Sequence, residues 1–265
     1  MYAFNYHRPS SIEEVGRILG SAPDASLLAG GQSLIPTLKQ RLAEPSDLID
    51  LNSVADLDTI DVDGDTLRIG AMARHAAVAA SADVRGAIPG LSALAELIGD
   101  HQVRNRGTIG GSIANNDPAA DYPAAAIALD ATIETTQREI PADDFFHGLF
   151  ETALEAGEIV TAVRFKVPQR AAYAKFMQPA SRFALVGVMV AQYGNGVRVA
   201  VTGAGMSVFR VTEMETALAT DFSAEAIRAI GVSADELNTD LHGTAEYRAH
   251  LINVMARRAV TQAAG

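Results

Sequence analysis

Apolar residues at helical spacing predict two helices near the start of the chain. The apolar positions within 15–19 share one helical face, and the SSIEE segment at 10–14 makes overlapping capping boxes in front of them. Leucines four residues apart predict a second helix that begins directly after Ser33 and runs to Leu42.

Short apolar or alternating runs between turn residues predict strands and hairpins. Asp63-Gly64-Asp65 and Gly194-Asn195-Gly196 each separate two such runs, and this composition is typical of hairpin turns. Further strands are expected at 25–29, 48–51, 132–136 and 159–167. Further helices are expected at 73–80, 91–99, 124–129 and 247–263.

The order of these elements predicts an α+β chain in two unequal parts. Mixed strands and helices fill the first two thirds, up to a boundary at Pro168 and the polar pair Gln169-Arg170. The remainder holds a strand hairpin followed by helices. A smaller C-terminal domain is therefore expected.

Composition and charge narrow the classes of function. A net charge of −11 and a pI near 4.9 make nucleic acid an unfavourable partner. No apolar run approaches the length of a membrane span, and the start of the chain lacks the texture of a secretory signal. Cysteine is absent, so this chain offers no disulfide and no thiolate ligand for zinc or an iron–sulfur cluster. The cytoplasm is the expected compartment.

Two glycine-rich segments carry the strongest chemical signal. The first glycine segment is LLAGGQS at 27–33, and the second glycine segment is GTIGGS at 107–112. Adjacent glycines let backbone N–H groups converge on an anion, and the serine adds a hydroxyl donor. One such segment alone is more often a tight turn. Two together suit a pyrophosphate, which has two phosphates to bind.

A polar cluster follows the second glycine segment. Asn115, Asn116, Asp117 and Asp121 lie within the stretch 104–123, which is too polar and too rich in glycine for a core element. The asparagines alone could be turn formers. Beside two glycine segments, the cluster indicates a ligand site.

The common nucleotide-binding motifs are absent. No strand is followed by G-x-G-x-x-G, and G-x-x-x-x-G-K-[ST] does not occur. Gly203-Ala204-Gly205 comes nearest, but Val208 stands where the third glycine is required. The chain is therefore expected to be neither a Rossmann nor a P-loop protein.

Several motifs together give the chain a family resemblance. The start has the pattern F-x-Y-x-R-P-x-S, and LLAGGQSLIPTLKQRLAEPSDLIDL, LRIGAMARHA and QVRNRGTIGGSIANNDPAADYPAA follow, with a fainter GAGMSVFRVTEMETAL in the last third. These motifs resemble the FAD-binding medium subunit of the molybdenum hydroxylases, such as the carbon monoxide dehydrogenase medium chain and the flavin domain of xanthine dehydrogenase. The resemblance covers nearly the whole chain.

The resemblance implies a fold and a division into domains. It implies a two-subdomain FAD-binding fold of the vanillyl-alcohol oxidase type, in residues 1–54 and 55–169. A small C-terminal domain with an antiparallel sheet and helices, specific to this flavin group, would occupy residues 170–265.

The resemblance also implies which residues hold FAD. The pyrophosphate would be bound by Ala29, Gly30, Gly31, Gln32 and Ser33 and by Thr108, Ile109, Gly110, Gly111 and Ser112. Asp121 would bond the ribose-bearing portion, with Asn115 nearby, and the backbone of Ile159 and Val160 would contact the ring system. Lys175 would lie near the isoalloxazine, and Phe183 falls where carbon monoxide dehydrogenase-like chains carry a tyrosine.

Two positions depart from the family pattern. Gln32 stands in place of a histidine common in the carbon monoxide dehydrogenase group, and Phe183 lacks the tyrosine hydroxyl. One missing hydrogen bond is worth about 0.5–1.5 kcal/mol, so FAD binding is expected to survive.

The implied function is electron transfer within a larger enzyme. Electrons would arrive from a small [2Fe–2S] subunit, stay on FAD and leave to an external acceptor such as a quinone, a cytochrome, dioxygen or NAD. A large subunit would carry the molybdenum cofactor, in a dimer of heterotrimers. The alternatives are a free-standing flavin oxidase or reductase of the vanillyl-alcohol oxidase type and a flavin-free assembly subunit.

The remaining polar residues have simpler interpretations. The six histidines show no metal-ligand spacing, and His75 and His101 are expected to be structural or surface residues. Arg104 and Arg106 either attract phosphate or a partner's acidic face, or form a solvated basic pair. The acidic residues at 143–144 and 151–158 are expected to form a solvated face.

Overall fold

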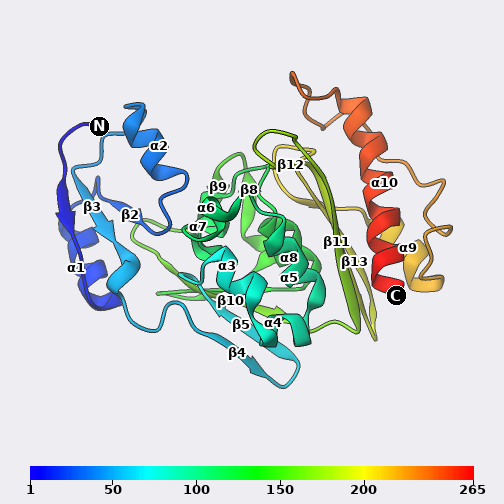
Figure 1. The fold of residues 1–265 in the computed structure, drawn as a ribbon, viewed down its shortest axis with the longest axis horizontal. Coiled ribbons are helices and arrows are strands. Elements are labelled where there is room, and N and C mark those ends of the chain that lie inside the picture. Colours follow the sequence, from blue (N-terminus) through cyan, green and yellow to red (C-terminus); the bar gives the residue numbers. More distant parts are fainter.

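The computed structural model describes all 265 residues, which form fourteen strands and ten α-helices (Figure 1). The strands are β1 Asn5–His7, β2 Ser26–Leu28, β3 Asp47–Asp50, β4 Ile60–Asp63, β5 Thr66–Gly70, β6 Thr132–Thr135, β7 Glu139–Pro141, β8 Phe146–Gly148, β9 Glu151–Thr152, β10 Val160–Lys166, β11 Arg170–Met177, β12 Ala184–Tyr193, β13 Gly196–Thr202 and β14 Phe209–Arg210. The helices are α1 Ile12–Ser21, α2 Leu34–Lys39, α3 His75–Ala80, α4 Ala82–Ala87, α5 Pro89–Glu96, α6 His101–Arg104, α7 Ile109–Asn115, α8 Tyr122–Ala128, α9 Thr212–Thr220 and α10 Ala245–Ala264. Two 3₁₀ turns lie at Leu51–Ser53 and Ala142–Asp144.

A small parallel sheet forms the N-terminal end of the molecule (Figure 1). Its strand order is β1-β3-β2, and α1 contributes Val15 to the core that it shares with Ile49 of β3. The predicted capping of α1 is present: the Ser11 hydroxyl accepts a hydrogen bond from the Glu14 N–H, and the Glu14 carboxylate accepts one from the Ser10 N–H.

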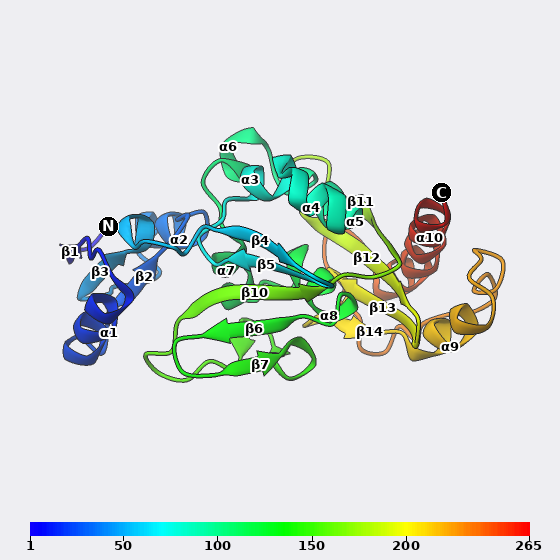
Figure 2. The ribbon, with the colours of Figure 1, turned by 90° about the horizontal axis from the view of Figure 1, so that it is seen from below.

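A five-stranded antiparallel sheet, ordered β4-β5-β10-β6-β7, occupies the middle of the chain (Figure 2). The predicted hairpin joins β4 to β5, where Asp63 pairs with Thr66. Gly64 has a φ of 59° in this turn, a conformation that glycine adopts without the steric cost of a Cβ.

A four-stranded antiparallel sheet, β11-β12-β13-β14, begins at Arg170, the last residue of the predicted boundary. The long helix α10 packs against β11 and β12 on the far side of this sheet, together with α9 (Figure 2). The predicted second hairpin joins β12 to β13, with Tyr193 paired to Gly196.

The largest core fills the space between the five-stranded and four-stranded sheets. It contains Leu67, Phe165 and Met189 from the sheets and Leu91 and Tyr122 from the helices between them. Helix α8 is buried along its whole length, which its alanine-rich sequence permits because small side chains let the neighbouring elements approach closely. These contacts fix the helices against both sheets.

Three expectations from the sequence are wrong in the structure. The stretch 104–123 does reach the core, because Ile109 and Ile113 on α7 are fully buried. Helix α2 ends at Lys39, before Leu42, which is 74% exposed. Glu158 is not part of a solvated face.

Glu158 is instead the buried partner of an arginine. Its side chain is enclosed, and its carboxylate accepts hydrogen bonds of 3.1 Å from both Nε and Nη2 of Arg138. These bonds lower the pKa of Glu158 to about 2. The acidic composition of 151–158 therefore hides one structural carboxylate.

The observed architecture confirms the predicted α+β class, with a sheet-and-helix C-terminal part. None of its helices has the length and apolar character needed to cross a bilayer.

Candidate functional site

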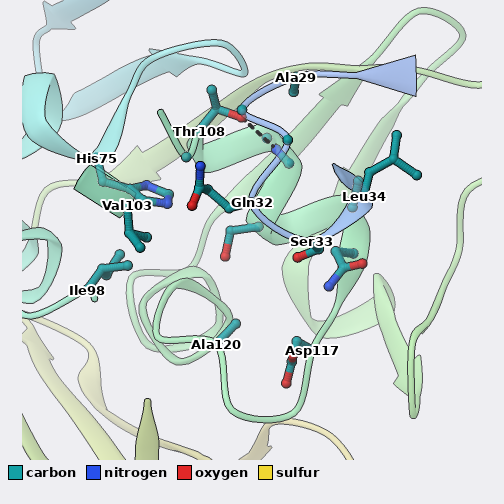
Figure 3. Close-up of a pocket in the computed structure, with 18 of the residues that line it drawn as sticks. Ala29, Gln32, Ser33, Leu34, His75, Ile98, Val103, Thr108, Asp117 and Ala120 are labelled. Atoms are coloured by element: carbon teal, nitrogen blue, oxygen red, sulfur yellow. Dashed lines mark hydrogen bonds between the residues drawn. The ribbon is translucent and has the colours of Figure 1, made fainter. Parts of the chain in front are cut away.

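One cavity of about 660 Å³ lies where the three parts of the chain meet. Its wall includes the first glycine segment, the second glycine segment and the tip of the β11–β12 hairpin at 181–183. Figure 3 shows His75, Val103 and Ile98 on one side and Ser33 and Leu34 on the other. A volume of this size is typical of pockets for small molecules and cofactors.

The first glycine segment provides unpaired backbone donors. The N–H groups of residues 30–33 make no hydrogen bond within the protein. Gly31 turns the chain with a φ of 71°, and Asn52 anchors the segment by donating to the Ala29 carbonyl over 3.2 Å. The hydroxyl of Ser33 does not cap α2 and stays available. Such a row of free donors at a cavity suits an anionic group.

The second glycine segment provides hydroxyl groups, and five of its six N–H groups, all but that of Thr108, are bonded within the protein. Its Ile109 and Gly110 N–H groups donate to the carbonyls of Ala73 and Ala71 over 3.0 and 2.8 Å. The Gly111 N–H donates to the hydroxyl of Thr108, which caps α7, over 3.2 Å. The two segments therefore offer different donors, and Thr108 and Ser112 supply hydroxyl groups to the cavity on this side.

The glycines of the two segments have different structural roles. A Cβ on Gly30 would overlap the Arg106 carbonyl, so this glycine lets the two segments touch. A Cβ on Gly110 would lie 2.7 Å from the Ala71 oxygen, so this glycine lets α7 pack on the β5–α3 connection. Gly111 is exposed on the cavity wall, and a Cβ there would fill space beside Thr108.

The polar cluster after α7 divides into cavity and structural residues. Asn115 and Asp117 line the cavity. Asn116 is buried with a φ of 40°, and its side-chain amide donates to the carbonyls of Gly148 and Glu151 over 2.9 and 2.7 Å. Asn116 therefore ends α7 and holds the β8–β9 hairpin.

Asp121 lies on the cavity wall within a buried ion pair. Its carboxylate is 2.9 Å from the Lys175 ammonium and accepts a 2.5 Å hydrogen bond from the Tyr173 hydroxyl. Lys175 also donates to the Leu97 carbonyl over 3.1 Å. Burial raises the pKa of Asp121, while Lys175 and Tyr173 act in the opposite direction. Lys175 itself is enclosed behind Asp121 and does not line the cavity.

The cavity wall also includes Ile159, Val160 and Phe183. Ile159 and Val160 lead into β10, and their side chains are buried in two different cores. Phe183 sits at the tip of the β11–β12 hairpin, with its ring 5.5 Å from the ring of His242.

The structure thus brings nearly all of the predicted site residues to one cavity. The cavity wall contains Ala29, Gly30, Gly31, Gln32, Ser33, Thr108, Gly110, Gly111, Ser112, Asn115, Asp121, Ile159, Val160 and Phe183. Ile109 is buried in the core next to this wall, and Lys175 lies behind it.

Other wall residues were not predicted. His75, expected to be a structural or surface residue, is buried on the wall, as is Met72, and the apolar side chains of Ile98 and Val103 are half-buried there. The sequence did contain a signal for His75, because this residue lies in LRIGAMARHA, one of the motifs that carry the family resemblance. No group of three or more histidine and acidic side chains has a metal-site arrangement.

The family was identified by comparison with known proteins. Residues 2–169 match the family described as the FAD binding domain in molybdopterin dehydrogenase. The chain belongs to the FAD-binding medium subunits of the molybdenum hydroxylases. This confirms the resemblance inferred from the motifs, and it establishes the protein as the flavoprotein subunit of an oxidoreductase.

The relatives of this medium subunit align over almost their full length. It is 36% identical to the nicotine 6-hydroxylase medium subunit of Paenarthrobacter nicotinovorans, covering 98% of this chain and 97% of the relative. It is 37% identical to the carbon monoxide dehydrogenase medium chain of Hydrogenophaga pseudoflava, covering 98% and 96%. A solved structure of the Hydrogenophaga pseudoflava carbon monoxide dehydrogenase, lacking the Mo-pyranopterin moiety, matches with a TM-score of 0.90 over 99% of this chain and 97% of the other.

The cavity of the medium subunit fits FAD chemically. The free N–H groups at 30–33 and the hydroxyls of Thr108 and Ser112 suit a pyrophosphate. The apolar side chains of Ile98, Val103 and Leu34 suit the ring systems of a dinucleotide.

Proposed function

We propose that this medium subunit takes electrons from a [2Fe–2S] subunit, holds them on FAD and passes them to an external acceptor. The cytoplasmic complex would also contain a large molybdenum subunit, as a dimer of heterotrimers. The full-length alignment with proteins named as medium subunits and medium chains supports this role over a free-standing flavin oxidase. The absence of cysteine from this chain is consistent with clusters carried by another subunit.

The observation that carries the proposal is the row of unpaired N–H groups at 30–33 beside the hydroxyls of Thr108 and Ser112. We assign these groups to the FAD pyrophosphate. Gly111 leaves the necessary room on the α7 side.

The remaining wall residues would orient the cofactor. Asp121 is fixed by Lys175 and Tyr173 but retains lone pairs that can accept from a sugar hydroxyl. Ile159, Val160 and Phe183 would bound the flavin ring. When bound, FAD supplies the redox chemistry, and this chain supplies binding, orientation and electrostatics.

The three larger sheets support the proposed division into two FAD-binding subdomains, 1–54 and 55–169, and a C-terminal domain, 170–265. The C-terminal domain would complete the FAD site through Phe183 at its hairpin tip and through the Lys175 support of Asp121.

Purification of the native complex through a tag on this chain tests the proposal. The expected product contains FAD, iron and molybdenum with two further subunits, and reduction of the iron–sulfur centres bleaches the flavin absorbance. A flavin-containing protein that purifies alone and oxidises a substrate by itself would favour the free-standing oxidase.

A further inference from the structure

His75 is a buried polar residue on the cavity wall without a hydrogen-bond partner. It is 5% exposed, and it begins helix α3. Its Nδ1 is enclosed and unpaired, and its Nε2 forms no hydrogen bond within the protein either. Figure 3 shows the imidazole reaching from the ribbon toward the space between Thr108, Val103 and Gln32.

Gly107 leaves the Nε2 edge of this ring uncovered. The backbone N–H of His75 donates to the Gly107 carbonyl over 3.0 Å, and this bond holds the start of α3 against the second glycine segment. A Cβ at position 107 would lie 2.5 Å from Nε2. Glycine at this position therefore keeps the ring nitrogen from being covered by a neighbouring side chain.

The surroundings of His75 favour its neutral form. The ring of Tyr122 lies 5.4 Å away, and its buried hydroxyl is also unpaired. Burial and the positive charge of Arg104 lower the pKa of His75 to about 4. Asp121, which lines the same cavity, is paired with Lys175. At neutral pH the imidazole therefore has one donor nitrogen and one acceptor nitrogen.

Packing alone does not explain a buried imidazole without a side-chain hydrogen-bond partner at position 75. Burying a polar group without a partner is unfavourable, and an apolar ring of similar shape would fill the same space without that cost. Nδ1 is enclosed, whereas Nε2 is not among the enclosed atoms and has no partner within the protein, so Nε2 is the ring nitrogen that a ligand in this cavity can reach.

We propose that His75 binds FAD through Nε2, as a neutral hydrogen-bonding group between the two glycine segments. This inference rests on the proposed FAD site and adds a residue that the family motifs did not assign. Because the ring is uncharged, its contribution to binding should stay constant across neutral pH.

Substitution of His75 in the full chain tests the inference. His75→Phe keeps an aromatic ring beside Tyr122 and removes both nitrogens, so it is expected to weaken FAD binding about tenfold. His75→Gln retains a side-chain amide and is expected to recover part of that loss. His250→Phe, on the exposed surface of α10, is the matched control and should bind FAD as the wild type does.

FAD affinity is measured by flavin fluorescence, and the fold of each apo variant by circular dichroism and thermal unfolding. His75→Phe should melt at or above the wild-type temperature, because it removes an unpaired buried imidazole. FAD binding within about twofold of wild type by a folded His75→Phe overturns the inference.

A second measurement needs no variant. In the ¹⁵N-histidine-labelled wild type, the ring resonances of His75 should keep the pattern of a neutral imidazole at pH 5.5 and should shift when FAD is added. Unchanged His75 resonances in an FAD-saturated sample overturn the inference about His75 and leave the proposed FAD site standing. A wild-type chain that does not bind FAD at all would instead reject the proposed function.

Discussion

Gly111 is the position where a side chain should obstruct FAD while leaving the fold intact. A Cβ there would lie 2.9 Å from the Thr108 hydroxyl and 3.7 Å from the Ala29 Cβ, with no backbone of another element in the way. Gly30 offers no such test, because a Cβ there would overlap the Arg106 backbone. We therefore consider Gly111→Leu.

The expected effect on stability is small because two terms oppose each other. Replacing glycine inside α7 with a good helix former contributes about 0.5–1 kcal/mol. Displacing the Thr108 hydroxyl from its capping bond costs about 0.5–2 kcal/mol. The net change is within about 1.5 kcal/mol, which corresponds to a few degrees in the melting temperature.

The expected effect on FAD binding is larger. An added side chain in an occupied site costs about 1–3 kcal/mol, so affinity should fall by about tenfold to a hundredfold. Gly86→Leu is the matched control, because Gly86 is exposed in α4 with open space around its Cβ position. Thermal unfolding of the apo chain and FAD titration by fluorescence separate the two effects. A folded Gly111→Leu chain with wild-type FAD affinity would refute the placement of FAD in this cavity.

Three further substitutions test other parts of the account. Asp121→Asn leaves the Lys175 ammonium buried without its carboxylate and should lower the free energy of unfolding in urea by about 3–5 kcal/mol. An equal loss of stability in Asp143→Asn, at an exposed ion pair, would contradict this. Glu158→Gln removes a carboxyl whose pKa is lowered from 4.5 to about 2, so the wild type should lose stability as the pH falls through that range and the variant should lose less. Identical pH profiles in thermal unfolding would count against the Glu158–Arg138 pair. Phe183→Tyr should change the rate of flavin reoxidation by acceptors more than FAD affinity, and no change in either would remove Phe183 from the site.

Local sequence signals were sufficient for most of the fold. The start of α1 follows from the serine and glutamate side chains that cap it, and the β4–β5 turn follows from Gly64. Both depend only on residues a few positions apart. The two glycine segments were found for the same reason, since their spacing is visible within each motif.

Long-range packing decided the features that the sequence did not reveal. Helix α7 reaches the core because Gly110 fits against Ala71, a contact that composition does not encode. Glu158 is buried because Arg138, twenty residues away, satisfies its charge. Lys175 lies behind Asp121 because β11 passes along the back of the cavity, which only the docking of the C-terminal sheet determines.

The same limit applied to the anion site. Both glycine segments have similar sequences, but the second uses its N–H groups to bind Ala71 and Ala73. Which backbone N–H groups remain free for a ligand depends on the segments of the chain that pack beside each motif in the fold.

Titration of the apo chain with FAD, followed by flavin fluorescence and by chromatography of the bound cofactor, tests the central claim most directly. The account predicts saturable binding of one FAD per chain, weakened in Gly111→Leu and unchanged in Gly86→Leu. A folded wild-type chain that takes up no FAD, either alone or in the complex from its native source, would contradict it.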